Sequence, residues 1–146
     1  MNYKTNNTDE ISIFIPTKNR HTFLSRLIKY YSNKSFIGKL IIFDASDGKD
    51  LKKNKQLLSR KYTFSTDHII ENKRPMISLN SHLDLINTRF ATVCNDDDIL
   101  TFEGLNKSSE LLKKNNSFSA CWGTGLKVKT KNDDPFENIT KQKNTK

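Results

Sequence analysis

Short apolar runs alternate along this chain with segments of helical period, and that alternation limits the fold more than any other feature. The first two runs, Ile11–Ile15 and Lys39–Phe43, are rich in β-branched and other apolar residues. Runs of this kind are typical of strands covered on both faces of a sheet. Between them, one helical face carries Phe23, Leu24, Leu27, Ile28 and Tyr31, spaced as in an amphipathic helix.

The same alternation continues toward the carboxyl end. It predicts helices over 49–61, 76–86 and 101–115, and strands over 68–70, 89–94, 117–122 and 126–128. Strands and helices in this order predict an α/β domain, a Rossmann-like three-layer α/β/α arrangement around a mainly parallel sheet. We expect residues 1–10 to be disordered, residues 11–128 to form the domain, and residues 129–146 to form a loose basic tail.

Composition restricts the classes of protein that fit. The 146 residues suit one domain. No apolar run reaches the ~18 residues that a membrane span needs, and Met1–Glu10 is too polar for a secretory signal. We expect a cytoplasmic protein. The net charge of +9 leaves open a peripheral contact with the inner face of an anionic membrane. Nucleic acid is not expected as a partner, because the lysines are spread out, apart from Lys52, Lys53 and Lys55.

The cysteines and histidines do not form a metal motif. Cys94 and Cys121 lie far apart, each within an apolar run, and are expected to be buried free thiols. The histidines lack the spacing of zinc ligands. Trp122 is expected in the core, although its position before a Gly-Thr-Gly segment leaves a stacking role open.

Three consecutive carboxylates, Asp96, Asp97 and Asp98, follow the apolar run that ends at Cys94. If the chain there is extended, Asp96 and Asp98 point to the same side. Two such carboxylates offer the hard oxygen ligands that Mg²⁺ or Mn²⁺ prefers. The alternative is a solvated acidic turn that caps the next helix.

Three loops that follow strands are expected to meet at one edge of the sheet, namely 17–20, 44–48 and 95–98. They would bring Lys18 and Arg20 close to the carboxylates, a pairing suited to a metal-bound pyrophosphate. Lys73 and Arg74 are further candidates to reach such a ligand. Asp44 has two interpretations, an acceptor for a ribose or base and a turn residue bonded to its own backbone.

Three segments resemble the family 2 glycosyltransferases, which have an A-type nucleotide-diphosphosugar-binding fold. The opening Ile-Ser-Ile-Phe-Ile-Pro-Thr-Lys-Asn-Arg of residues 11–20 is similar to that family's first strand and loop, with Lys18 in place of an aromatic residue. Leu-Ile-Ile-Phe-Asp-Ala-Ser-Asp over 40–47 resembles the second strand and its turn, and Asn-Asp-Asp-Asp over 95–98 resembles the Asp-x-Asp metal motif. Their order and spacing match over residues 11–125.

The resemblance implies a transferase that moves a sugar from a nucleotide-diphosphate donor to a glycan or lipid-linked acceptor. Asp96 and Asp98 would hold Mn²⁺ or Mg²⁺, acting as a Lewis acid toward the departing diphosphate; in the other register, Asn95 and Asp97 take the two motif positions. The implied nucleotide-binding residues are Pro16, Thr17, Asn19, Arg20, Asp44, Ser46, Arg74, Asp96 and Asp97. Family members are usually longer than this chain, so the expectation covers a glycosyltransferase or its donor-binding portion, with no catalytic base assigned.

Two other classes stay open. One is another Mg²⁺-dependent enzyme of nucleotidyl or phosphoryl transfer, disfavoured because the loop Pro16–Arg20 has neither glycine nor a nucleophilic carboxylate. The other is a non-catalytic α/β module that binds a nucleotide or metal, for which Asp44 at a strand end is the main support.

Overall fold

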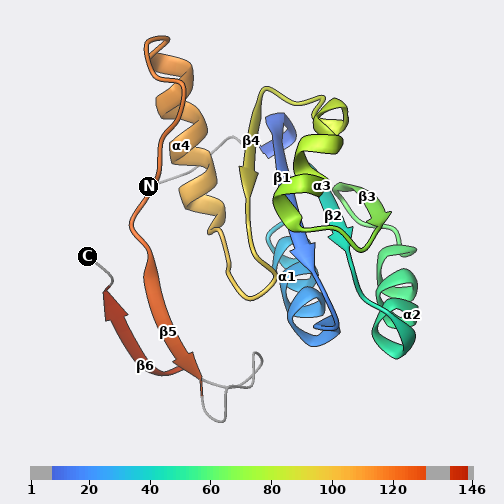
Figure 1. The fold of residues 1–146 in the computed structure, drawn as a ribbon. Helices are drawn as coiled ribbons and strands as arrows, with labels where there is room; N and C mark the ends of the chain where they lie inside the picture. Colours follow the sequence, from blue (N-terminus) through green and yellow to red (C-terminus); the bar gives the residue numbers. More distant parts are fainter. Residues whose placement is uncertain (1–7, 131–138, 145–146) are drawn as a thin grey trace.

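The computed structural model describes residues 8–130 and 139–144, and within them strands and helices alternate as the sequence predicts (Figure 1). The strands are β1 (Ile11–Thr17), β2 (Lys39–Asp44), β3 (Ser65–Ile70), β4 (Phe90–Val93), β5 (Leu126–Thr130) and β6 (Ile139–Asn144). The helices are α1 (His21–Asn33), α2 (Gly48–Leu58), α3 (Pro75–Ser81) and α4 (Phe102–Lys114), with short 3₁₀ turns η1 (Thr8–Glu10) and η2 (Leu83–Leu85).

The first four strands form one parallel sheet in the order β3-β2-β1-β4. The predicted Rossmann-like α/β fold with a mainly parallel sheet is therefore confirmed. The chain adds β2 and β3 on one side of β1 and then returns to place β4 on the other side. Ligands bind at such a reversal in open α/β sheets, beyond the carboxyl ends of the strands. Here that point lies between β1 and β4.

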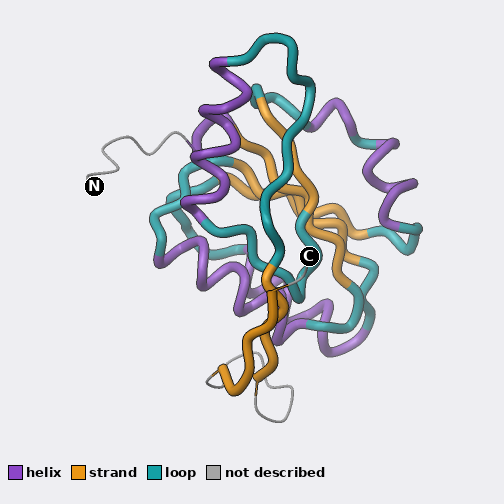
Figure 2. Tube along the Cα trace, turned by 90° about the vertical axis from the view of Figure 1, so that its left-hand side faces the viewer, coloured by secondary structure: helices purple, strands orange, loops and turns teal. Residues whose placement is uncertain are grey.

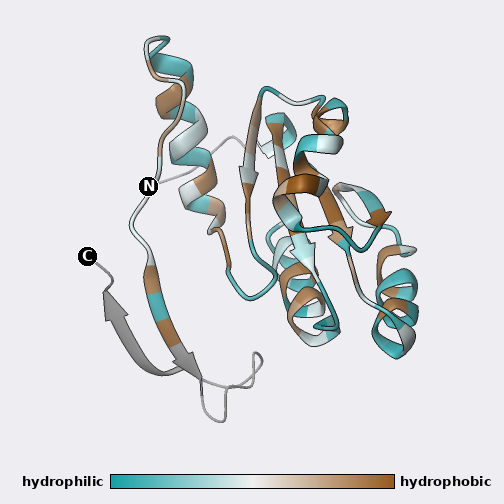
Figure 3. Ribbon diagram, in the orientation of Figure 1, coloured by the Kyte–Doolittle hydropathy of each residue, from teal (hydrophilic) through white to brown (hydrophobic). Residues whose placement is uncertain are grey.

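The core is divided between the two faces of the sheet because successive strand residues point in opposite directions. On one face Ile13 and Ile15 pack with residues of α1 and α2, such as Leu27 and Leu57. On the other face Phe14, Ile41 and Phe43 form a smaller cluster with residues of α3 and η2. Each large apolar side chain buried in this way contributes about 1.5–3 kcal/mol to folding. Figure 3 shows the hydrophobic colouring along β2, at the centre of the sheet.

The ends of the domain differ from the sequence-based expectation. Residues 8–10, expected within a disordered N-terminus, form η1, and the fully buried Thr8 accepts a hydrogen bond from the Ile37 amide at 3.1 Å. Residues 1–7 lie outside the described part. The predicted helix over 76–86 is divided into α3 and η2. The expected thiol at Cys94 is free and buried, whereas Cys121 is free and only partly buried.

The predicted strand over 117–122 is wrong, and so is the expected burial of Trp122, which is 92% exposed. Instead, α4 carries the chain away from the sheet, a turn closes between Asn115 and Phe118, and Cys121 lies against the Ser108 carbonyl of α4. The segment thus has no strand beside it with which to pair in the described structure.

Part of the segment expected to be a loose tail is paired. Strands β5 and β6 form a two-stranded antiparallel sheet, separate from the parallel sheet (Figure 2). Residues 131–138 and 145–146 of the same segment lie outside the described residues. Among the described helices, none has both the length and the apolar character needed to cross a membrane.

Candidate functional site

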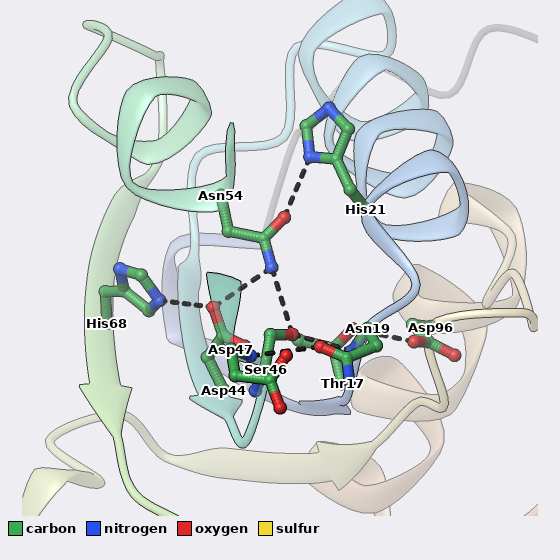
Figure 4. Close-up of polar contacts among 9 residues, drawn as sticks. All are labelled: Thr17, Asn19, His21, Asp44, Ser46, Asp47, Asn54, His68 and Asp96. Atoms are coloured by element: carbon green, nitrogen blue, oxygen red, sulfur yellow. Dashed lines mark hydrogen bonds and ion pairs between the residues drawn. The ribbon is translucent and has the colours of Figure 1, made fainter. Parts of the chain in front are cut away.

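The three loops predicted to meet do lie together at the carboxyl ends of β1, β2 and β4 (Figure 4). The hydroxyl of Thr17, the last residue of β1, donates to Oδ2 of Asp96 at 2.8 Å. Asn19 joins the first loop to the second: its amide donates to Ser46 Oγ at 2.8 Å, and its side-chain oxygen accepts from the Asp47 amide at 3.0 Å. Each of these bonds links segments far apart in sequence, so the loops form one structure.

Asn19 has the backbone conformation that makes the double link to the second loop feasible. Its φ is +53°, in the left-handed region that Asn tolerates better than most residues. At this φ the chain turns sharply between β1 and α1. The conformation of the backbone therefore gives a local reason for an Asn at position 19 of the first loop.

Arg20 pairs with two carboxylates of the triplet. One guanidinium nitrogen lies 3.2 Å from Asp96 Oδ1 and the other 2.8 Å from Asp97 Oδ2. The Asp96 side chain is 3% exposed, and burial raises its pKa. The hydrogen bond from Arg20 lowers the pKa of Asp97, which is 44% exposed. The two neighbouring carboxylates thus differ in exposure and in the direction of their pKa shifts, because the fold removes Asp96 from water and leaves Asp97 partly exposed.

The triplet forms a turn, so the extended geometry assumed for it is wrong. The Asp98 amide donates to the Asn95 carbonyl at 3.1 Å, and the Asn95 side chain donates to Asp98 Oδ2 at 3.1 Å. In a turn, residues two positions apart need not share a side, so Asp96 and Asp98 are not held on the same side as an extended chain would hold them. Asp96 faces Thr17 and Arg20, whereas Asp98 is exposed and bonded to Asn95.

Carboxylates suit Mn²⁺ or Mg²⁺ by their chemistry, but those of the triplet do not converge. Both oxygens of Asp96 already have protein partners, and Arg20 occupies the space between Asp96 and Asp97. Over residues 8–130 and 139–144 no group of three or more acidic, His or Cys side chains is arranged to hold a metal. Asp96 and Asp98 thus bond to different partners, and their role as ligands of a cation stays a prediction.

Asp44 is fully buried and lies at the centre of a second network (Figure 4). Its Oδ1 accepts from the Ser46 amide at 2.9 Å, which is the turn bond of one sequence-based interpretation. Its Oδ2 accepts from Asn54 at 3.0 Å and lies 2.9 Å from His68 Nε2. Burial alone would raise the pKa of Asp44, but the hydrogen bonds from His68, Ser46 and Asn54 outweigh it and lower the pKa to about 2.

The sequence reasoning missed the roles of Asn54 and His68. Asn54 is fully buried in α2 and its side-chain oxygen lies 2.8 Å from His21 Nδ1. A signal for Asn54 did exist: it occupies the helical face of Leu57 and Leu58, and a polar side chain on such a face needs a buried partner. His68 had no comparable signal, because its partner lies on the neighbouring strand.

An open cleft of about 600 Å³ lies beside these loops. Its lining includes residues from β1, β2, the segment before α3 and the carboxylate turn, namely Pro16, Thr17, Lys18, Arg20, Phe43, Ala45, Glu71, Asn72, Lys73, Arg74, Pro75, Ser78, Asn95, Asp96 and Asp97. The volume lies within the range of small-molecule sites, ~300–1,000 Å³. The lining carries four cationic and three acidic side chains, a mixture suited to a polar, charged ligand.

The residues predicted to bind a nucleotide fall into two groups. Pro16, Thr17, Arg20, Arg74, Asp96 and Asp97 line the cleft. Asn19, Asp44 and Ser46 are outside the lining and instead connect the loops to one another. Asp98, predicted as a metal ligand, is outside the lining as well. Lys73 lines the cleft and pairs with Glu71 at 2.7 Å.

No model of a known protein family matches the sequence, and a search of curated proteins finds no matching sequence. The fold and the site therefore define a class only. The chain contains a small α/β domain with a four-stranded, all-parallel, Rossmann-like sheet, and a charged cleft lies at the carboxyl edge of that sheet.

Proposed function

We propose that this chain is a glycosyltransferase similar to family 2, or the donor-binding portion of one, and that the cleft holds a nucleotide-diphosphate sugar. One observation carries the proposal. Asp96 is almost fully buried, and it lies at the reversal of the sheet between Thr17 and Arg20. A desolvated carboxylate beside a cleft of about 600 Å³ is the arrangement expected of a binding site rather than of a surface turn.

The charges of the cleft suggest how a donor would bind. Lys18, Lys73 and Arg74 lie in its lining and supply positive charge for phosphate oxygens. Arg20 is pre-positioned by Asp96 and Asp97 and offers further N–H donors. In the proposed complex the diphosphate lies near these cations, and Phe43 offers an apolar surface for the nucleoside.

A divalent cation is part of the proposal on the chemistry of the three carboxylates alone. When bound, Mn²⁺ or Mg²⁺ would neutralise charge on the departing diphosphate. Comparison of nucleotide binding in Mn²⁺ and in EDTA tests whether the chain takes up such an ion.

Calorimetric titration with UDP and GDP, in the presence of Mn²⁺ and in the presence of EDTA, tests the proposal. Asp96→Asn removes the negative charge that holds the Arg20 guanidinium in place. It is expected to weaken nucleotide binding at least about tenfold, the effect of losing one charge-assisted contact. Asp98→Asn tests the cation and is expected to reduce only the binding that depends on Mn²⁺. Asp84→Asn, at an exposed residue of η2, is the matched control. A folded chain that binds neither nucleotide under any condition would contradict the proposal.

A second candidate, a non-catalytic nucleotide-binding module, is favoured by one observation. The carboxylates that line the cleft, Glu71, Asp96 and Asp97, each form an ion pair with a cation, and a general base has to be free to take a proton. Release of UDP or GDP from nucleotide sugars, measured with glycan and lipid-linked acceptors, separates the two. Binding without turnover on any acceptor would favour the module.

A further inference from the structure

The positive charge of this chain is concentrated in one layer of the fold. Residues 21–64, which include α1 and α2, contain ten Lys or Arg residues and three Asp residues, a net charge of +7 out of +9 for the whole chain. Of the three aspartates, Asp44 is fully buried and bonded within its network. The lysines looked evenly spread along the sequence, but in the folded chain most of the net positive charge lies in one layer.

These cations are exposed, and they outnumber Asp47 and Asp50, the two aspartates of the same segment that are not buried. Six of them follow one another along α2 and the turn after it, all exposed: Lys49, Lys52, Lys53, Lys55, Arg60 and Lys61. Lys29 and Lys34 of the neighbouring α1 region are exposed as well. Among the described residues none of these eight forms an ion pair with a carboxylate. Figure 3 shows much of α2 coloured as hydrophilic.

We propose that this surface, which we call the basic face, docks the protein on an anionic lipid bilayer. The partner is argued from charge complementarity: clustered lysines on one side of a domain are attracted to the negative surface of a membrane. The two helices pack side by side in one layer, since residues of both belong to the same buried cluster, and so they present a broad surface to a planar partner.

The chemistry of the basic face favours lipid over nucleic acid. Single-stranded nucleic acid is held by aromatic side chains that are open for stacking as well as by cations. The aromatic residues near the basic face are engaged. Phe23 lies beneath the guanidinium groups of Arg20 and Arg26, and Tyr62 stacks on Phe64 with ring centroids 4.8 Å apart.

Docking through the basic face leaves the cleft accessible. The cleft is lined by residues of the loops at the strand ends and of the segment leading into α3, which packs on the opposite face of the sheet. None of the eight cations of the basic face lines the cleft. The proposal is therefore independent of the proposed nucleotide site, and substitutions can change either one alone.

Co-sedimentation with lipid vesicles tests the proposal, using phosphatidylcholine alone and phosphatidylcholine with about 30% phosphatidylglycerol. We expect binding to the anionic vesicles only, weakened by at least about tenfold between about 50 and 500 mM NaCl because salt screens the attraction. The variant Lys49→Gln/Lys52→Gln/Lys53→Gln should lower the partition coefficient by roughly fivefold for each lysine removed. Exposed lysines are replaced, so the fold should persist, and circular dichroism checks this.

The matched control is Arg89→Gln/Lys107→Gln/Lys127→Gln, which removes the same charge from exposed residues outside α1 and α2. We expect it to keep most of the vesicle binding. Equal loss in both triple variants, equal binding to neutral vesicles, or no binding at low salt would overturn the proposal. So would displacement from the vesicles by a duplex RNA at equal charge. Nucleotide titration of the α2 variant and vesicle binding by Asp96→Asn show separately whether either site has failed.

Discussion

The Thr17 hydroxyl donates a 2.8 Å hydrogen bond to Asp96 across 79 positions of sequence, and it joins the ends of two neighbouring parallel strands. Asp96 is almost fully buried, so this donor offsets part of the cost of removing its charge from water. Thr17 is thus both the end of β1 and a partner of the carboxylate that the proposed function requires.

Thr17→Val tests the value of this bond, because it keeps the shape of the side chain and removes the donor. We expect a loss of about 1–3 kcal/mol in the free energy of unfolding, the cost of leaving a buried acceptor short of a partner. Urea denaturation measures it. Thr22→Val, at an exposed position of α1, is the control, and equal effects of the two substitutions would contradict the importance of the bond.

Asp96→Asn should increase stability while it weakens nucleotide binding. Burial raises the pKa of Asp96 in the folded chain, so the ionised carboxylate opposes folding at neutral pH. Asn removes that charge, and such conflicts between stability and activity are common at functional sites. The expected gain appears at pH 7 in urea denaturation.

The gain from Asp96→Asn should shrink as the pH falls through the raised folded-state pKa of Asp96 toward about 4. Below about 4 it should be lost, because the carboxyl group is then protonated in the folded and the unfolded chain alike. The linkage has this sign because the folded-state pKa is raised. A variant that is less stable than the parent at pH 7 would show that the pairs with Arg20 and Thr17 outweigh the cost of burial.

Asp44 should have the opposite effect on the pH dependence of stability, because its ionised form stabilises the folded chain. Its pKa is lowered from 3.8 to about 2 by the hydrogen bonds of its network. The corresponding stabilisation, about 2 kcal/mol, is present above pH 4 and is lost as the pH falls from about 4 to 2. Unfolding monitored from pH 5 to pH 2 measures it. Asp44→Asn should remove this part of the acid dependence, whereas Asp84→Asn, on an exposed residue, should leave it unchanged.

Trp122 should contribute little to stability in spite of its size. It is 92% exposed, so Trp122→Ser is expected to change the free energy of unfolding by less than about 0.5 kcal/mol. Phe36→Ala is the contrasting variant, since Phe36 is fully buried against Tyr31 and Phe64. Its expected loss is about 3–5 kcal/mol. A large effect at Trp122 in thermal or urea unfolding would mean that the indole has a partner in solution.

The alternation of strands and helices was predictable from residues 11–115, because β1 and β2 are buried on both faces and their apolar runs are continuous. The meeting of the three loops followed from parallel pairing alone. The Asn95–Asp98 turn did not, since its side-chain bond competes locally with an extended chain. Asn54 and His68 gain their roles from neighbours in space, and the strand predicted over 117–122 failed because periodicity does not reveal whether a partner strand is within reach.

The double link through Asn19 has a consequence for how the cleft adapts to what it binds. The amide and the side chain of Asn19 bond loop 17–20 to loop 44–47, so these two loops form one rigid wall of the cleft. On the other side Asn72 is reached by Lys18 at 3.3 Å, an exposed contact. Exchanges at residues 72–73, which line the cleft, should therefore change its shape while leaving both bonds of Asn19 in place.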